Sequence, residues 1–350
     1  MKLFQQIFVY LYKKYEVMGG KALNKYGITT ERKSTEDFNR IGKQIQERIK
    51  HDLGLISHIV VCYHTKESHG DLDLLIRIDD NDSINWKVYI HSKFKPNAIH
   101  NNGGVYSFDY DGFQIDFIPV KKHKWETAKT YYSYDPLGNI MGKTYHKFNL
   151  SYGWDGLFYK FRNFNGRLAE NILISNDPRK IFEFGDYDYD RYLQGFDYIE
   201  EIFEFVQKSK YFDNEMFKME NLKHIDRKRN RKRGSYHLFL EYLEKNNINR
   251  RYEFHKDKDK YLMMIDYYFP EANLMDKLHN LSIIDKENKI LSQKFNGDMV
   301  MVWIPNLMGK ELGAAMTKFK NALGNDYREF ILNSRYDEIY NRFMEIYEKE

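Results

Sequence analysis

A short run in which two aspartates alternate with leucines places the strongest constraint on how this chain folds. Residues 71–78 read DLDLLIRI and follow Gly70 in the longer segment KESHGDLDLLIRI. The alternation predicts a β-strand in which Asp71 and Asp73 project from one face, roughly 6–7 Å apart at Cα. The leucines would hold this strand in a core. Two neighbouring acids repel each other unless they are solvated or a divalent cation bridges them.

A third acid has the same setting in a later segment. Asp116 is the one acid in the apolar run 113–120, and that run follows the pair Asp111-Gly112, which is typical of a hairpin turn. If the two strands are neighbours, the three carboxylates converge. Oxygen ligands of this kind suit Mg²⁺ or Mn²⁺. They give the layout for nucleotidyl transfer with two metal ions about 3.5–4 Å apart.

Together, these segments resemble the DNA polymerase β-like nucleotidyltransferase superfamily, and its family X polymerases in particular. The palm of those enzymes carries Lys-Glu-x-x-Gly-Asp-φ-Asp-φ-φ, where φ is apolar. A later strand reads Arg-φ-Asp-φ and usually runs on to a proline. The resemblance covers about residues 40–150. The matching positions are Lys66, Glu67, Gly70, Asp71, Asp73, Asp116 and Pro119.

The resemblance implies roles for the three acids. Asp71 and Asp73 are expected to bind both metal ions. Asp116 is expected to bind the catalytic ion and to orient or activate the acceptor hydroxyl. The implied reaction transfers a nucleoside monophosphate from an NTP or dNTP to a hydroxyl and releases pyrophosphate.

The chain departs from the superfamily pattern where the triphosphate is held. The superfamily has Gly-Ser or Gly-Gly shortly before the acids, and the ungapped equivalent here is Val60-Val61. The pair Gly19-Gly20 lies about 50 residues before Asp71, which exceeds the usual spacing. The residues expected to contribute to the nucleotide site are therefore Lys66, Ser68 and Gly70.

The pattern of the whole chain predicts an α+β protein with three parts. These are an N-terminal helical segment (1–34), a nucleotidyltransferase palm with a small mixed sheet (35–150) and a mainly α-helical C-terminal region (151–350). Apolar residues four apart predict helices at Leu3, Ile7, Leu11 and Tyr15, and at Ile41, Ile45 and Ile49, with Thr35 as N-cap. Strands are expected at 56–63, 71–78, 86–90, 105–108 and 113–120. Helices are expected within 137–170, as a helix–loop–helix, and at 196–209, 235–246, 258–268, 308–323 and 334–349.

Composition narrows the class of protein without naming a partner. Hydrophobic residues make up 42% and charged residues 30% of the 350 positions, which is typical of a globular chain. The net charge is +4, and the single cysteine excludes a disulfide framework. No apolar run reaches the roughly 18–20 residues of a membrane span, and no signal-peptide layout is present. These features predict a cytoplasmic protein in a reducing compartment, with no membrane partner.

One basic run predicts contact with a nucleic-acid backbone. It lies at residues 227–233 and reads RKRNRKR. Such a cluster neutralises phosphates and specifies no base sequence, although it is also typical of a solvated helix start. Its cations are Arg227, Lys228, Arg229, Arg231, Lys232 and Arg233.

A second, shorter segment is similar to the C-terminal Gly-x-Glu-φ-Gly helix of tRNA nucleotidyltransferases that add CCA. The matching positions are Gly309, Glu311, Leu312 and Gly313.

We expect a metal-dependent nucleotidyltransferase that acts on the 3′ end of DNA, RNA or tRNA. The alternatives are a toxin-type or small-molecule-modifying transferase, and a non-catalytic palm that serves as a binding or scaffold module. The sequence leaves the oligomeric state open.

Overall fold

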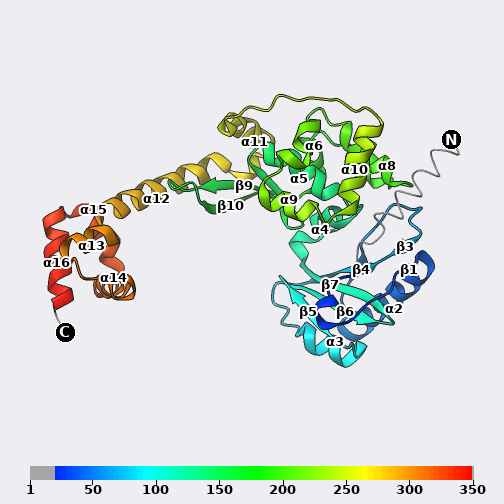
Figure 1. Ribbon diagram of the computed structural model, residues 1–350, viewed down its shortest axis with the longest axis horizontal. Coiled ribbons are helices and arrows are strands. Elements are labelled where there is room, and N and C mark those ends of the chain that lie inside the picture. Colours follow the sequence, from blue (N-terminus) through cyan, green and yellow to red (C-terminus); the bar gives the residue numbers. More distant parts are fainter. Residues whose placement is uncertain (1–19, 349–350) are drawn as a thin grey trace. The chain divides into compact units, whose positions relative to one another are not determined.

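The computed structural model describes residues 20–348, and these fall into two compact units (Figure 1). The first unit contains residues 20–159 and 173–272, and the second contains 160–172 and 273–348. The predicted helical stripe at Leu3, Ile7, Leu11 and Tyr15 lies outside the described residues. Mixed α and β structure followed by a mainly helical C-terminal region confirms the α+β prediction.

The secondary structure is numbered along the chain. The strands are β1 (Lys33–Ser34), β2 (Ser57–Ile59), β3 (Ser68–His69), β4 (Asp71–Ile78), β5 (Ile99–Asn102), β6 (Val105–Tyr110), β7 (Phe113–Lys121), β8 (Leu150–Gly153), β9 (Gly156–Arg162) and β10 (Leu168–Ser175). The α-helices are α2 (Thr35–Leu53), α3 (Trp86–Phe94), α4 (Trp125–Tyr132), α5 (Leu137–Lys147), α6 (Pro178–Phe184), α7 (Tyr189–Leu193), α8 (Ile199–Gln207), α9 (His224–Asn230), α10 (Gly234–Lys245), α11 (Leu262–Tyr268), α12 (Leu274–Lys294), α13 (Gly297–Trp303), α14 (Gly309–Leu323), α15 (Tyr327–Asn333) and α16 (Tyr336–Glu348). Short 3-10 helices lie at Asn24–Tyr26, Lys122–Lys124, Asn214–Met216, Met219–Asn221, Lys258–Tyr261, Pro270–Ala272 and Gly324–Asp326.

A five-stranded mixed sheet forms the centre of the first unit. Its strand order is β2-β4-β7-β6-β5. Strands β4 and β7 run parallel, and the other neighbours are antiparallel. A parallel pair needs a crossover connection, and here α3 and the strands β5 and β6 lie between β4 and β7 in the sequence. The hairpin expected around Asp111-Gly112 is present as β6 and β7.

Helix α2 follows from local signals in the sequence. The Ser34 side chain accepts a hydrogen bond from the Asp37 backbone N–H at 3.2 Å, so Ser34 and not Thr35 is the N-cap. Thr35 is instead the first helical residue, and its hydroxyl donates to the carbonyl of Lys66. The predicted stripe Ile41, Ile45 and Ile49 is buried against the sheet, as its spacing of four residues requires.

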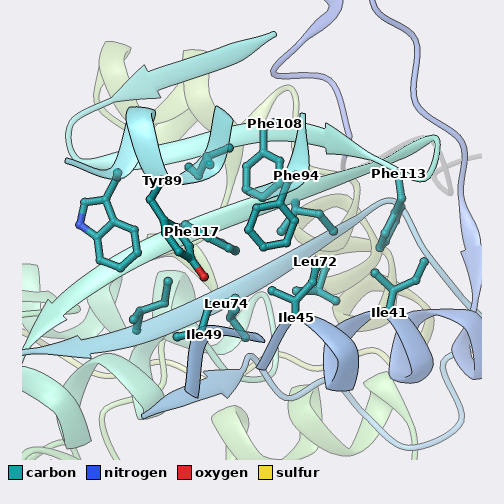
Figure 2. Packing of buried hydrophobic residues seen from close by; sticks show 14 of the residues in the cluster. Ile41, Ile45, Ile49, Leu72, Leu74, Tyr89, Phe94, Phe108, Phe113 and Phe117 are labelled. Carbon is teal, nitrogen blue, oxygen red and sulfur yellow. The ribbon is translucent and has the colours of Figure 1, made fainter. Parts of the chain in front are cut away.

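The main core lies between one face of the sheet and helices α2 and α3 (Figure 2). The sheet contributes Leu72 and Leu74 from β4 and three phenylalanines from the β6–β7 hairpin, including Phe117. Phe117 makes edge contacts with the rings of Phe94 and Phe108, with centroids 5.6 and 4.9 Å apart. Every second residue of β4 is thus committed to this face, which leaves the alternate residues for the other face.

Residues 86–90 form a helix and not the predicted strand. Helix α3 begins there because the Asn85 side chain accepts a hydrogen bond from the Val88 N–H at 3.2 Å. Trp86, Ile90 and Phe94 recur every four residues and are buried, which is helical spacing. The β-branched and aromatic composition of WKVYI favours a strand. The N-cap at Asn85 and the helical spacing that continues to Phe94 lie outside those five residues, and they favour a helix.

Three further predictions of secondary structure are corrected. Residues 150–162 form the hairpin of β8 and β9, where Leu150 pairs with Tyr159, and not the second half of a helix–loop–helix. Strand β2 covers only three residues of the predicted 56–63. In the described part of the predicted N-terminal helical segment, residues 20–34, the structure has a 3-10 turn and the short strand β1.

The second unit has a separate helical core. It is built from α12 to α16 around aromatic side chains that include Phe295, Phe319 and Phe343. Helix α14 begins at Gly309, so residues 309–313 form its first turn. No helix among residues 20–348 is long and apolar enough to cross a membrane.

Replacing Phe117 by alanine tests the core of the sheet. Phe117 is fully buried, so the change removes apolar contacts and leaves a cavity. We expect a loss of about 3–5 kcal/mol in the free energy of unfolding, measured by urea denaturation. The control is Val88→Ala on α3, where the side chain is 62% exposed and the expected change is below about 0.5 kcal/mol. Equal effects of the two changes would contradict this packing.

Candidate active site

The three predicted acids lie together on neighbouring strands. Strands β4 and β7 are parallel, and Asp73 lies directly opposite Asp116, while Asp71 lies opposite Gln114. All three aspartates are partly buried. The pairing brings together carboxylates that are more than 40 residues apart in the sequence.

The face that carries the acids is opposite the one that packs on α2 and α3. Further along the same face, Leu75 and Ile118 are covered by α4, in a second small core with Trp125 and Ala128. The apolar end of this face is therefore sealed by a helix. The acidic end begins at Asp71, where β4 starts, and it keeps access to solvent.

Burial raises the pKa values of all three carboxyl groups, and repulsion among the acids adds to the shift at Asp73 and Asp116. Desolvation is the main cause for Asp73, whose pKa is well above its usual range, and the charges of Asp71 and Asp116 add to it. The pKa of Asp116 rises to about 7, chiefly by desolvation and then by the charge of Asp71. The pKa of Asp71 is also raised by desolvation, although the N–H of Gly20 and the charge of Lys66 oppose the shift.

Such a cluster matches the chemistry of a divalent cation, whose charge would offset the repulsion and whose preferred ligands are carboxylate oxygens. Within residues 20–348, however, no group of three or more His, Cys, Asp or Glu side chains is arranged to hold a metal ion. Two of the three acids, Asp71 and Asp116, instead accept hydrogen bonds from other groups. The N–H of Gly20 donates to Oδ2 of Asp71 at 3.1 Å, and Nε2 of Gln114 donates to both oxygens of Asp116 at 3.0 and 3.2 Å.

Gly20 lies beside Asp71 in the fold, although its spacing from the acids in the sequence exceeds the usual one. Its backbone has φ +72°, and a Cβ atom at this position would overlap the carbonyl oxygen of Gly70. The Thr30 hydroxyl donates to the Gly20 carbonyl at 2.8 Å and fixes this approach. Helix α2 and strand β2 intervene in the sequence, which explains the spacing of 51 residues between Gly20 and Asp71. Its neighbour Gly19 lies outside the described residues.

Val60 does not take the place of a phosphate-binding glycine. Its side chain is buried in the small core with Leu75 and Trp125, and its N–H donates to the carbonyl of Asp73. Val60 thus bonds to β4 through its backbone and packs in the small apolar core through its side chain.

The three residues expected at the nucleotide site have different surroundings. Lys66 is near the acids: its Nζ lies 3.5 Å from Sγ of Cys62, and its charge opposes the raised pKa of Asp71 and Asp73. Ser68 accepts a hydrogen bond from Nε of Arg32 at 3.2 Å. Gly70 is buried beneath Gly20.

Arg32 is a residue near the site that the sequence reasoning missed. Its guanidinium donates to the carbonyl of Ser68 at 2.9 Å, and its charge also opposes the raised pKa of Asp71. The pairing of β1 with β3 places it there. No motif spacing could have found it, because β1 is too short to be recognised from alternation.

A fourth acid, Asp135, lies in the turn between α4 and α5. Desolvation is the largest cause of the raised pKa of Asp71 and Asp73, and the charge of Asp135 makes a smaller contribution in the same direction. The Ser235 hydroxyl donates to Oδ2 of Asp135 at 2.5 Å, and Nη1 of Arg233 lies 3.9 Å from its Oδ1. The last cation of the basic run therefore lies beside Asp135.

The rest of the basic run is divided between structural and exposed positions. Arg227 donates to the carbonyls of Glu220 and Leu222, both at 2.9 Å, and so holds the turn before α9. Arg233 is only 26% exposed beside Asp135. The exposed members are Lys228, Arg229, Arg231 and Lys232.

The raised pKa values predict how stability depends on pH in the absence of divalent cations. Between about pH 4, the ordinary pKa of an aspartate, and about pH 7, the folded state binds more protons at Asp116 than the unfolded chain does. Stability therefore falls as pH rises through this window. Asp73→Asn removes one of the repelling charges, so we expect its melting temperature to exceed that of the unmodified protein by several degrees at pH 8 and by much less at pH 4.5.

Asp52→Asn is a control of opposite sign. Hydrogen bonds from His51 and Lys93 lower the pKa of Asp52, so this carboxylate stabilises the fold at neutral and higher pH. Its replacement should lower the melting temperature at pH 8. Thermal unfolding in EDTA checks both variants. A lower melting temperature for Asp73→Asn at pH 8 would show that the acids do not repel one another.

Comparisons with known proteins give a partial structural match. No protein-family model and no curated protein sequence matches the chain. Two crystal structures of Leishmania infantum polymerase beta, a ternary gap complex and a ternary P/T complex, match 37% of the chain at 14% identity, with TM-scores of 0.32 and 0.31. The match spans 52% and 59% of those polymerase chains.

Proposed function

We propose that the protein is a divalent-cation-dependent nucleotidyltransferase. It would transfer a nucleoside monophosphate from an NTP or dNTP to a hydroxyl group and release pyrophosphate. The observation that carries this proposal is the register of β4 and β7, which sets Asp73 opposite Asp116, with Asp71 on the same open end of the sheet face. Three neighbouring carboxylates with raised pKa values are costly to a fold and are typical of a functional site.

The acids would hold Mg²⁺ or Mn²⁺. When bound, two such ions lower the pKa of an attacking hydroxyl and neutralise charge on the phosphates. The carboxylates of Asp71 and Asp73 are the ligands expected for both ions, and Asp116 is the ligand expected nearest the acceptor hydroxyl. To form this set, the side chains of Asp71 and Asp116 must turn toward the ions, and an oxygen that accepts from Gly20 or Gln114 keeps further lone pairs for a metal ion.

Three groups beside the acids suit the phosphates of a nucleotide. The backbone N–H of Gly20 points at the site and has no side chain in the way, which is the property that a phosphate cradle needs. Lys66 and Arg32 add positive charge close enough to shift the pKa of Asp71. We therefore assign the triphosphate to the side of the site formed by residues 20, 32 and 66.

The acceptor that best fits the surface is the 3′ end of a nucleic acid. The basic run ends at Arg233, which is linked through Asp135 to the surroundings of the acids. Its four exposed cations are suited to phosphates of a strand whose end enters the site. A backbone contact of this kind carries no base preference.

Charge-neutral variants of the acids test the reaction. Asp73→Asn and Asp116→Asn should each lower the rate of nucleotide addition by about 100- to 1000-fold, because each removes a ligand that places positive charge at the reacting phosphate. The assay is incorporation of labelled NTP and dNTP into DNA, RNA and tRNA with Mg²⁺ or Mn²⁺. The control is Asp79→Asn at an exposed position after β4, which should retain full activity. Metal-dependent incorporation that persists in both variants would refute the proposed reaction.

The exposed cations test the acceptor. Replacing Lys228, Arg229, Arg231 and Lys232 together by glutamine should weaken binding to single-stranded nucleic acid and reduce the slope of log K against log [salt] by about 2–3. Fluorescence anisotropy at several salt concentrations measures both. A matched control replaces four exposed lysines elsewhere, namely Lys43, Lys50, Lys87 and Lys256. An equal loss in the two sets would mean that the run has no special part in binding.

A further inference from the structure

Gln114 is a buried amide that joins the third acid to the N-terminal part of the chain. Its side chain lies on β7, two residues before Asp116, and is 2% exposed. Nε2 donates to both carboxylate oxygens of Asp116, at 3.0 and 3.2 Å. On the other side, Oε1 accepts a hydrogen bond from the backbone N–H of Ala22 at 2.9 Å.

The two partners of Gln114 permit only one orientation of its amide. The N–H of Ala22 needs an acceptor, and the carboxylate of Asp116 needs a donor. A flipped amide would place a donor against a donor and an oxygen against the carboxylate. The orientation of Gln114 thus depends on Asp116, and the Ala22 N–H depends on Gln114 for its acceptor.

Residues 20–34, which we call the strap, are attached beside the acids at several points. The N–H of Gly20 donates to Asp71, and the Thr30 hydroxyl holds the Gly20 carbonyl. Further along, the N–H of Glu31 donates to the Gly112 carbonyl at 2.8 Å, and β1 pairs with β3. One end of the strap therefore contacts two of the acids. It reaches Asp71 directly and Asp116 through Gln114.

A glutamine at this position differs from the superfamily pattern, which has an arginine two residues before the third acid. An arginine would supply a positive charge and no acceptor. Gln114 supplies no charge, so it leaves the repulsion among the acids in place, but it adds an acceptor for the strap. Gln114 therefore ties the strap to Asp116 without neutralising any of the acids.

We propose that Gln114 is a positioning residue that couples docking of the strap to cation binding at the acids. The inference rests on the proposed function, because it assumes that the acids bind a divalent cation. A carboxylate that accepts from an amide keeps further lone pairs for a metal ion, and such supporting hydrogen bonds raise metal affinity. A cation that fixes Asp116 also fixes Gln114, and through it the acceptor of the Ala22 N–H. By linkage, a docked strap strengthens cation binding by the same factor.

Gln114→Met tests the coupling, because it keeps the length and buried volume of the side chain but loses all three hydrogen bonds, two to Asp116 and one from Ala22. Mn²⁺ binding to the full chain, measured by electron paramagnetic resonance without nucleotide, should weaken about tenfold. The matched control is Gln46→Met on α2, which loses a hydrogen bond from Nε2 to the Ser57 carbonyl, away from the acids. This control should bind Mn²⁺ as the unmodified protein does.

Thr30→Val tests the coupling from the strap without altering Gln114 or any carboxylate. It removes the hydrogen bond to the Gly20 carbonyl, so Mn²⁺ affinity should fall a few-fold. Amide hydrogen exchange gives a second readout. Addition of Mn²⁺ should slow exchange at Ala22 in the unmodified protein and leave it unchanged in Gln114→Met. The Thr30→Val result decides the question even if Gln114→Met does not fold.

Asp73→Asn separates this inference from the proposed function. If it binds Mn²⁺ as tightly as the unmodified protein, the cation site and the proposed function both fail. If Asp73→Asn binds weakly while Gln114→Met and Thr30→Val bind normally, the cation site stands and the coupling is refuted. Weaker binding in all three variants, with normal binding in Gln46→Met, supports the coupling.

Discussion

The parallel pairing of β4 and β7 is the contact on which the rest of the first unit depends. It sets Asp73 beside Asp116 and, on the opposite face, aligns the apolar residues that pack on α2 and α3. The side-chain period of a strand is two, so a slip of one residue in either strand would bury acids in the main core and expose leucines. The apolar core therefore fixes the register, and the register fixes the site.

The three neighbouring acids lower the stability of the fold when they are ionised. Desolvation and like charge raise the pKa values of all three carboxyl groups. Lys66 and Arg32 offset this only in part, since the net shift at Asp71 remains upward. A divalent cation would relieve the repulsion. A cluster of like charges that lowers stability in this way is common at functional sites.

The strap changes how the site is understood. A palm sheet with three acids could function as a self-contained unit, but here the N–H groups of Gly20 and Ala22 reach the acids directly or through Gln114. The segment that completes the site comes before α2 in the sequence and returns to the sheet through β1. Under the proposed function, cation binding, nucleotide binding and strap docking would share the same few hydrogen bonds, so none of them would be independent of the others.

The sequence by itself determined the strands that carry the acids, the hairpin at Asp111-Gly112 and the buried stripe of α2. These depend on periodicity and on turn residues within a few positions, which are local properties. It failed at Trp86–Phe94, where a cap and a helical repeat outweigh β-branched composition, and at residues 150–162, where β8 and β9 form a hairpin. Local patterns of similar length are ambiguous until packing decides between them.

Only the tertiary structure decided which distant residues meet at the acids. Gly20, Arg32 and Asp135 reach the site through strand pairing and helix packing, and no spacing in the sequence encodes those contacts. The basic run likewise divided into Arg227, which holds a turn, Arg233, which lies beside Asp135, and four exposed cations. The physical reason is that alternation and capping act between near neighbours, whereas the pairing of segments depends on the core that forms between them.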